Sequence, residues 1–259
     1  MTYIVLIGAP GVGKGTFSSI IQAQTGWKHL SLGEHLREEM RSGSNLGAEI
    51  GGILQRGGLV TDKVANEVTF KRLDHIQRTY TDTTAESLIR AWGMAVLLDG
   101  YPRTKPQAEA LYDHIASTSA SKGAENVVAA VQISLEPWVA EEKLLQRKQC
   151  LTCGQNFNTA DIVQDGFDMP AILPNEDNCL NVRDGLPCDP ALSITRSDDS
   201  RETIRRRRRE FEEKTTPVVD FFKQRGELVE FNVKKGVKDT PDLLNVVLRH
   251  MHSQRYVYE

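Results

Sequence analysis

The sequence predicts an α/β fold in which a parallel sheet is covered by helices on both faces. Short apolar runs alternate with longer stretches of helical spacing, and we expect strands at residues 3–7, 27–32, 94–98, 127–135 and 228–233. This alternation is typical of parallel sheets, which bind their ligands at the carboxyl ends of the strands. A glycine-rich segment follows the first run directly, so the first candidate site lies at this edge of the sheet.

The glycine-rich segment at residues 8–16 reads GAPGVGKGT and lies between an apolar strand and a predicted helix. Its glycines free the backbone to form a nest of N–H donors, and the helix N-terminus adds partial positive charge, so the segment suits a polyphosphate. Lys14 would reach the outer phosphates, and Thr16 would donate its hydroxyl. The expected nucleotide contacts are Gly11, Gly13, Lys14, Gly15 and Thr16. A chance glycine cluster is the alternative, which the flanking apolar runs disfavour.

Length and composition bound the class of protein. A chain of 259 residues, 39% apolar and 26% charged, is long enough for a sizeable α/β domain with insertions. The net charge of -3 provides no general attraction to nucleic acid or to an anionic membrane surface. No apolar run approaches the ~20 residues that span a bilayer, and the first strand begins too early for a cleavable leader. We therefore expect a cytoplasmic protein without a membrane or nucleic-acid partner, and an uncleaved internal import signal is the alternative for its location.

A second informative segment follows the apolar run 94–98, where the chain reads DGYPRT from Asp99 to Thr104. Asp99 is placed like the acid that holds water around Mg²⁺ in phosphate-loop enzymes. For this segment alone, an acidic cap at a strand end is the alternative. Together with the glycine-rich loop, the segment favours a nucleotide site that uses Mg²⁺.

Separated segments of the chain resemble the adenylate kinases, in the order of that family. The loop spacing GxPGxGKGT and the DGYPRT segment are joined by SLGEHLR at residues 31–37. The resemblance implies a five-stranded P-loop NTPase-type core and a reversible, Mg²⁺-dependent transfer of a phosphoryl group from ATP to AMP, giving two ADP. We also expect a monomer. The implied divisions are a core domain at 1–30, 76–146 and 200–259, a helical NMP-binding domain at 31–75 and a lid domain at 147–199.

The same resemblance implies a site for the acceptor monophosphate. Arg37 and Arg103 would grip its phosphate, because a planar guanidinium makes two parallel charge-assisted bonds. The Gln107 amide would read the adenine edge. Uridylate and cytidylate kinases usually lack this glutamine, so AMP is the favoured acceptor. Leu32 stands where the family commonly carries a threonine that touches the base. The other expected contacts of the acceptor are Leu54, Leu59, Val60 and Gly100.

Arginines at the two ends of the implied lid would close on the transferring phosphoryl group. By resemblance these are Arg147, Arg196 and Arg207, with Asp198 and Asp199 orienting them. Phosphoryl transfer offers a protein little covalent chemistry, so catalysis would come from positioning and from neutralising charge. The remaining expected catalytic residues are Lys14, Asp99 and Arg103.

Lys143 departs from the family pattern at the donor site. It stands where many relatives place an arginine that stacks over the donor base, and an ammonium stacks less well than a guanidinium. The choice between ATP and GTP as donor therefore stays open.

Four cysteines lie in the implied lid. Cys150 and Cys153 have the CxxC form of a zinc knuckle, and Cys179 and Cys188 could supply the second pair despite their wider spacing. The resemblance implies a structural Zn²⁺ held by four thiolates, which leaves no position for water. Four reduced cysteines without metal are the alternative, and disulfides are disfavoured in a reducing cytoplasm.

Two other classes of function stay open from the residues alone. The arginine run 205–209 and the zinc-knuckle cysteines fit a nucleotide-dependent nucleic-acid-binding protein, but Glu210, Glu212 and Glu213 offset the run and DGYPRT is left without a purpose. The other class is a kinase-like fold that has lost activity and binds a partner. It is disfavoured because every expected catalytic residue is present.

Overall fold

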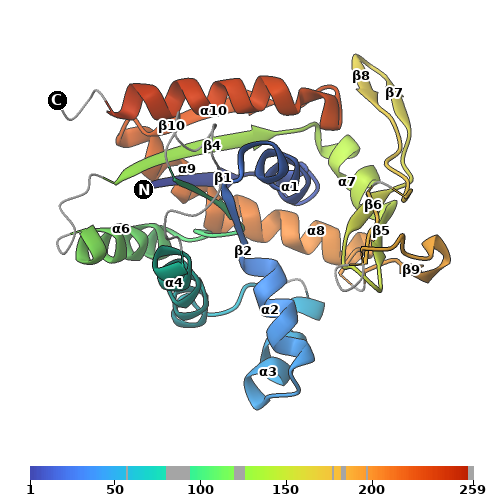
Figure 1. Ribbon diagram of the computed structural model, residues 1–259, viewed down its shortest axis with the longest axis horizontal. Helices are drawn as coiled ribbons and strands as arrows, with labels where there is room; N and C mark the ends of the chain where they lie inside the picture. Colours follow the sequence, from blue (N-terminus) through green and yellow to red (C-terminus); the bar gives the residue numbers. More distant parts are fainter. Residues whose placement is uncertain are drawn as a thin grey trace.

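The computed structural model describes residues 1–56, 58–79, 94–119, 126–176, 178–181, 185–196 and 198–255. Parts of the predicted core and lid ranges lie outside the described residues, as do Gly57 and Ser197, which border predicted acceptor and lid residues. Figure 1 shows a central sheet with helices on both sides, a helical projection at one edge and small strands at one end.

The central sheet has five parallel strands and confirms the predicted fold class. Its strands are β1 (Thr2–Ile7), β2 (Lys28–Ser31), β3 (Ala95–Asp99), β4 (Val127–Ser134) and β10 (Leu228–Asn232). Their order is β10-β4-β1-β3-β2, and every neighbouring pair is parallel. The carboxyl ends of β1 and β3 therefore lie side by side, which brings the glycine-rich loop and Asp99 to the same edge of the sheet.

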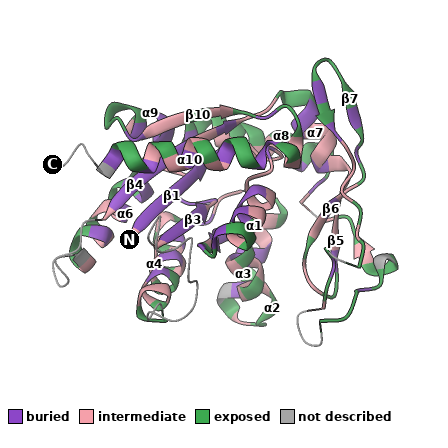
Figure 2. Cartoon of the chain, turned by 45° about the horizontal axis from the view of Figure 1, so that its top comes forward, coloured by how far each residue is buried: buried purple, intermediate pink, exposed green. Residues whose placement is uncertain are grey.

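The alternation of side chains along β1 explains why both faces of the sheet are covered. Tyr3, Val5 and Ile7 are buried on one face, and Ile4 and Leu6 are buried on the other. The first face packs against α4, α6 and α9, and the second against α1 and α10. Figure 2 shows β1, β3 and β4 buried between helices that carry exposed outer stripes. These helices are α1 (Lys14–Thr25), α4 (Asp62–Thr79), α6 (Lys105–Ser119), α9 (Thr216–Gln224) and α10 (Thr240–Arg255).

A helical insertion lies between β2 and β3, in the predicted acceptor range. Its helices α2 (Leu32–Arg41) and α3 (Asn45–Gln55) pack on each other and project from the sheet in Figure 1. The Ser44 hydroxyl caps α3 by accepting from the N–H of Gly47 at 2.9 Å. Leu36 and Ile50 belong to the same buried cluster as the first face of β1, so the insertion is packed onto the core.

A second insertion separates α7 (Pro137–Leu145) from α8 (Arg201–Glu210), in the predicted lid range. It contains a three-stranded antiparallel sheet and a two-stranded hairpin. Within the hairpin Ile162, Phe167 and Met169 are buried in the cluster that covers the second face of the central sheet. The elements are β5 (Arg147–Cys150), β6 (Asn156–Asn158), β7 (Ile162–Gln164), β8 (Phe167–Met169), the 3-10 turn η1 (Pro190–Leu192) and β9 (Ser193–Ile194).

The C-terminal elements complete the cover of the sheet. The arginine run 205–209 lies in α8, where Arg205 is exposed and Arg207 is half-buried, so the run spreads around the helix. A π-helical turn, η2 (Phe211–Thr215), joins α8 to α9, and its Thr215 hydroxyl donates to the Arg103 carbonyl at 3.0 Å. The 3-10 turn η3 (Gly236–Asp239) joins β10 to α10. Within the described ranges, no helix combines the length and the apolar character that crossing a membrane requires.

Candidate active site

The glycine-rich loop turns sharply between β1 and α1 and leaves the start of α1 open to a ligand. Gly11 has a φ of 93°, and a Cβ at this position would lie 2.5 Å from the Ala140 carbonyl oxygen, so only glycine fits. Gly13 occupies the N-cap of α1 and has no side chain to cap it. The first N–H groups of α1 are therefore available to an anion, together with the positive end of the helix dipole.

Lys14 begins α1 and folds back over the loop. Its Nζ donates to the carbonyl oxygens of Gly8 at 2.7 Å and Ala9 at 3.2 Å. Burial lowers the pKa of Lys14 to about 8, although the nearby Asp99 carboxylate acts to raise it. A phosphate anion beside Lys14 would favour the charged ammonium, which suits this side chain to a polyphosphate site.

Asp99 ends β3 next to the loop. Its side chain is 15% exposed, and its Oδ2 lies 3.8 Å from Nε2 of His29 on β2. Burial acts to raise the pKa of Asp99, but His29 and Lys14 outweigh it and lower the pKa. A Cβ on Gly15 would come within 3.3 Å of the carboxylate, so the glycine after Lys14 leaves room for it. An anionic carboxylate beside the phosphate loop is the ligand type that Mg²⁺ prefers, directly or through water.

Two clefts open from this edge of the sheet and meet over the loop. The first, which we call the loop cleft, is lined by residues 10–17 and contains every predicted donor contact. The second, the helix cleft, lies against α2 and α3 and contains every predicted acceptor contact. The residues that line both clefts include four cations, which are Lys14, Arg37, Arg103 and Arg207. The two clefts thus share a cationic junction.

The helix cleft has an apolar wall and a cationic end. The apolar wall is formed by Leu32, Leu54, Leu59 and Val60, and the cleft is completed by Gly100 and Gln107. At the cationic end, Nε of Arg37 is buried and has no hydrogen-bond partner among the described residues. Burial, reinforced by the charge of Arg196, lowers the pKa of Arg37 to about 10. A buried guanidinium nitrogen without an internal acceptor fits an anionic ligand.

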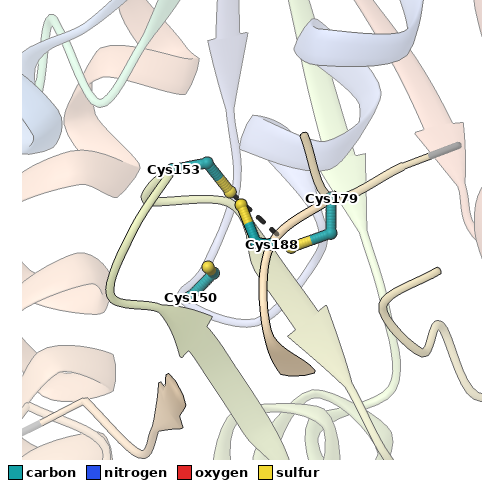
Figure 3. A group of neighbouring side chains, drawn as sticks. All are labelled: Cys150, Cys153, Cys179 and Cys188. Atoms are coloured by element: carbon teal, nitrogen blue, oxygen red, sulfur yellow. Dashed lines mark hydrogen bonds between the residues drawn. The ribbon is translucent and has the colours of Figure 1, made fainter. Parts of the chain in front are cut away.

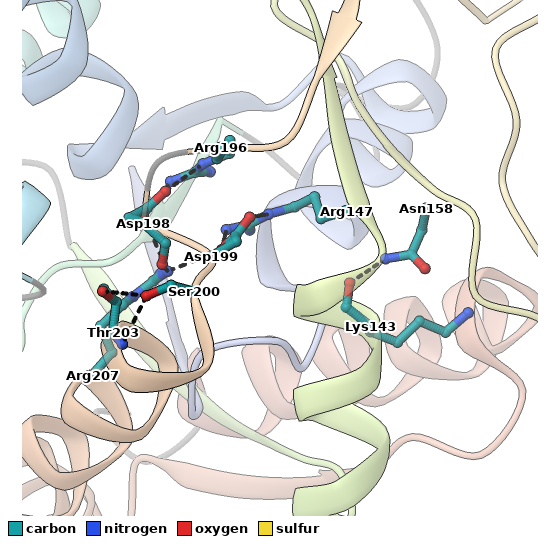
Figure 4. A network of polar contacts seen from close by, with 9 residues as sticks. All are labelled: Lys143, Arg147, Asn158, Arg196, Asp198, Asp199, Ser200, Thr203 and Arg207. Carbon is teal, nitrogen blue, oxygen red and sulfur yellow. Dashed lines mark hydrogen bonds and ion pairs between the residues drawn. The ribbon is translucent and has the colours of Figure 1, made fainter.

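The predicted lid arginines form one network with two aspartates (Figure 4). Arg147 makes a bidentate pair with Asp199, through Nε at 2.8 Å and a terminal nitrogen at 2.6 Å. Arg196 pairs in the same way with Asp198, at 2.9 and 2.7 Å. Arg207 joins the two pairs, because its terminal nitrogen lies 3.1 Å from Asp198 and 3.5 Å from Asp199. The geometry is that of arginines held at fixed spacing by one buried and one half-buried acid.

The charges of the arginines keep Asp198 ionised, and the cap at the start of α8 places Arg207 within reach of the two aspartates. Burial acts to raise the pKa of Asp198, but the charges of Arg207 and Arg196 outweigh it and hold the pKa well below its ordinary value. Ser200 caps α8 by accepting from the N–H of Thr203 at 3.2 Å. The cap starts the helix directly after the two aspartates, and Arg207 then lies two turns further on the side of α8 that faces them.

Lys143 lines the loop cleft, but its ammonium is engaged by the hairpin. It donates to the carbonyl oxygens of Ala160 at 3.0 Å and Met169 at 3.2 Å, and Figure 4 shows it pointing away from the arginine network. Burial lowers the pKa of Lys143. The side chain therefore fastens β8 to α7 at the wall of the cleft, a contact that its sequence position did not predict.

The hairpin is also tied to the core on its other side. The Asp168 N–H donates to the Lys234 carbonyl at 3.0 Å, and the Asp168 carboxylate pairs with Lys238 at 2.7 Å. Nζ of Lys234 lies 4.3 Å from the centroid of the Phe167 ring. These contacts hold Met169 at the loop cleft beside η3, whose Gly236 and Val237 also line the cleft.

The four cysteines converge on one point (Figure 3). Their sulfur atoms all lie within 4.8 Å of one another, and Sγ of Cys153 is 3.7 Å from Sγ of Cys179. Four sulfurs at ~2.3 Å from a tetrahedral Zn²⁺ would be about 3.8 Å apart, so the donor set and its spacing fit zinc. Burial and the neighbouring thiols raise the pKa of Cys188, and a bound cation would favour its thiolate form.

Three groups near the clefts were missed by sequence reasoning. They are His29 beside Asp99, Asp62 behind Gln107, and the two lysines Lys234 and Lys238 that contact the hairpin. His29 lies in a strand that was predicted, but nothing in the local pattern shows that β2 pairs with β3. Asp62 follows closely on Leu59 and Val60, two expected contacts of the acceptor, but it was not itself among the predicted site residues.

Comparison with known proteins agrees with the geometry. A family profile described as "Adenylate kinase" matches residues 6–227. A GTP:AMP phosphotransferase of Plasmodium falciparum is 32% identical over 255 residues, which cover 97% of this chain and 98% of that protein. An adenylate kinase of Thermotoga neapolitana is 33% identical over 248 residues, covering 95% and 94%. Adenylate kinase 1, chloroplastic, of Arabidopsis thaliana is 30% identical over 252 residues, covering 94% and 76%. Because these matches span nearly the whole chain and both of its insertions, the chain belongs to the adenylate kinase family and is a nucleoside monophosphate kinase.

Proposed function

We propose that the protein transfers a phosphoryl group reversibly from ATP to AMP, giving two ADP. The observation that carries the proposal is the junction of the two clefts, where Lys14, Arg37, Arg103 and Arg207 line both. A donor triphosphate in the loop cleft and a monophosphate in the helix cleft would meet over these cations. In-line transfer needs such a meeting point and little covalent chemistry from the protein.

The roles of individual residues follow from their positions. The loop N–H groups and Lys14 would hold the β- and γ-phosphates of the donor. Arg37 and Arg103 would hold the acceptor phosphate, and Arg147, Arg196 and Arg207 would neutralise the charge that develops on the transferring group. Hydrogen bonds within the protein already hold Lys14, Arg103, Arg147, Arg196 and Arg207, which limits how far these side chains must reorganise during the reaction.

Two metal ions belong to the proposal. Asp99 would hold Mg²⁺ through water, and the ion when bound would neutralise charge on the donor phosphates. Cys150, Cys153, Cys179 and Cys188 would hold a structural Zn²⁺, because four thiolates leave no open position for water. The zinc would join the β5 turn to the segment before β9.

The two insertions are proposed as moving parts. Residues 31–75 would form the NMP-binding domain and residues 147–199 the lid domain, hinged on a core of residues 1–30, 76–146 and 200–259. Closure would exclude water from the junction, since water could otherwise accept the phosphoryl group. We also propose that the enzyme acts as a monomer, because each expected contact comes from one chain.

GTP is the alternative donor. Lys143 is occupied by two backbone carbonyls and does not offer a stacking group, and one relative is named a GTP:AMP phosphotransferase. Adenine and guanine would then be distinguished by the backbone and apolar groups that line the far end of the loop cleft.

A phosphotransfer matrix tests the proposal. The purified protein with Mg²⁺ is offered ATP, GTP, CTP and UTP against AMP, GMP, CMP and UMP, and the diphosphate products are separated. We expect turnover with AMP as acceptor and ATP as the best donor. A Lys14→Met variant serves as the inactive control. An absence of turnover with AMP, whether or not another monophosphate is used, would refute the assignment. A preference for GTP over ATP would select the alternative donor.

A further inference from the structure

The Gln107 amide is held at both ends by protein groups of opposite polarity. Its Oε1 accepts from the backbone N–H of Arg103 at 2.8 Å, and its Nε2 donates to Oδ1 of Asp62 at 2.7 Å. An N–H only donates and a carboxylate only accepts, so the two contacts allow one orientation of the amide. Exchanging its oxygen and nitrogen would set a donor against a donor and an acceptor against an acceptor.

Asp62 contacts the Gln107 amide from the side that faces away from the helix cleft. Gln107 lines the helix cleft and is 2% exposed, whereas Asp62 is not among the described residues that line the cleft. The same Oδ1 of Asp62 also accepts from the Thr104 hydroxyl at 2.9 Å. On its main chain, the Gln107 carbonyl oxygen lies 3.0 Å from the Tyr101 hydroxyl. The amide is thus fixed through both its side chain and its backbone.

A fixed amide discriminates between purines by the polarity of their edges. Each end of the Gln107 amide has a second hydrogen-bonding position, which is an acceptor at Oε1 and a donor at Nε2. Adenine presents the N6 donor beside the N1 acceptor and matches this order, while hypoxanthine and guanine present the O6 acceptor beside the N1–H donor. A freely rotating amide would serve both edges, but an amide held in one orientation serves one of them.

The base cannot compensate by turning over. Arg37 and Arg103 would fix the acceptor phosphate, and the sugar then limits the pose of the base. Leu32, where the family commonly has a threonine, offers no polar group to the base. Gln55 also lines the cleft, but Gln107 is the amide that is held at both ends, so we assign it the choice between purine edges.

We propose that Asp62 is a positioning residue that holds the Gln107 amide in the orientation that accepts adenine and rejects a purine edge of reversed polarity. This inference rests on the proposed AMP site in the helix cleft.

Inosine monophosphate is the sharpest probe, because it differs from AMP at this edge and has nearly the same shape. With the wild-type protein and ATP, we expect kcat/KM for AMP to exceed that for inosine monophosphate about a hundredfold or more. Comparable use of the two acceptors would show a rotating amide and overturn the inference. No turnover with AMP would instead refute the proposed function, so the two failures are distinct. This comparison needs no substitution, and folding cannot obscure it.

Variants then test Asp62 itself. Asp62→Ala removes the acceptor at Nε2, and we expect the AMP preference to fall about tenfold through a higher KM for AMP and better use of inosine monophosphate. The KM for the donor should not change. Asp62→Asn keeps an oxygen that can accept from Gln107 and Thr104, so it should retain most of the preference. Glu67→Ala is the matched control, since Glu67 is an exposed acid on the same helix.

If Asp62 had only a structural role, its removal would lower the stability of the protein and would lower kcat/KM for AMP and for inosine monophosphate by the same factor. An unchanged preference for AMP over inosine monophosphate in folded Asp62→Ala would overturn the positioning role. Thermal unfolding of each variant, measured alongside the kinetics, establishes that the compared proteins are folded.

Discussion

Replacing Asp199 by alanine should destabilise the protein and slow phosphoryl transfer together. The Asp199 side chain is fully buried and makes a bidentate pair with Arg147, which is 18% exposed. Removing one partner of a buried pair costs roughly 3–5 kcal/mol, and the partial exposure of Arg147 places the expected loss in the free energy of unfolding near 3 kcal/mol. For a domain of this size, that corresponds to a fall in Tm of about 6–12 °C.

The kinetic effect follows from the same contacts. Without Asp199, Arg147 loses both hydrogen bonds and Arg207 loses one of its two acids. A displacement of a positioning group by ~1 Å can lower turnover about a hundredfold, and we expect a fall in kcat of this order. Circular dichroism during heating measures the Tm, and coupled detection of ADP measures kcat with ATP and AMP.

Glu202→Ala is the matched control for Asp199→Ala. Glu202 pairs with Arg206 on α8, but it is 84% exposed, and exposed pairs contribute about 0–1 kcal/mol. Its Tm and kcat should stay close to those of the wild type. A Tm for Asp199→Ala within ~2 °C of the wild type would mean that the pair does not anchor the network, and the reasoning would fail.

Three further predictions concern Lys14, the cysteines and Lys143. Burial lowers the pKa of Lys14 to about 8 from its ordinary 10.5. The buried ammonium therefore destabilises the ligand-free protein at low pH, and the free energy of unfolding should rise as the pH increases from about 8 to 10.5. Donor binding restores the proton, so calorimetry near pH 8.5 in buffers of different ionisation enthalpy should detect proton uptake, which Lys14→Met abolishes. Protein purified without chelator should contain about one zinc per chain, and Cys153→Ser should lower both zinc content and Tm; a metal-free protein with wild-type Tm would contradict the site. Lys143→Arg should change the KM of the donor more than that of AMP, because the contacts with Ala160 and Met169 lie at the loop cleft; equal changes in both would count against this assignment.

Local sequence patterns were sufficient to predict the central sheet. The run at 94–98 became β3 (Ala95–Asp99), and the run at 228–233 became β10 (Leu228–Asn232). The weaker run at 27–32 became β2, which ends at Ser31 because Leu32 already begins α2. The runs of β1 and β3 can be recognised locally because a strand covered on both faces must be apolar along its length, whereas the edge strands β2 and β10 are only partly buried.

The partners of buried polar groups could not be read from the sequence. Gln107 was expected to face a base, but its contact with Asp62 spans 45 positions in the chain. Lys143 was compared with a stacking arginine, yet its ammonium binds carbonyls of a hairpin that no pattern connected to α7. The hairpin alternates too briefly to reveal which surface it covers.

The sequence by itself determined the class of fold, the phosphate loop and the family, because backbone freedom at glycines and runs of apolar residues are local properties. Motifs such as DGYPRT also indicate which chemical groups belong to a site, before any coordinates are known. Only the tertiary structure decided that two clefts meet at shared cations, that the four cysteines converge, and that Asp62 holds Gln107. The physical reason is that a buried polar group takes its partner from whichever element packs beside it, and packing brings together residues that lie far apart in the chain.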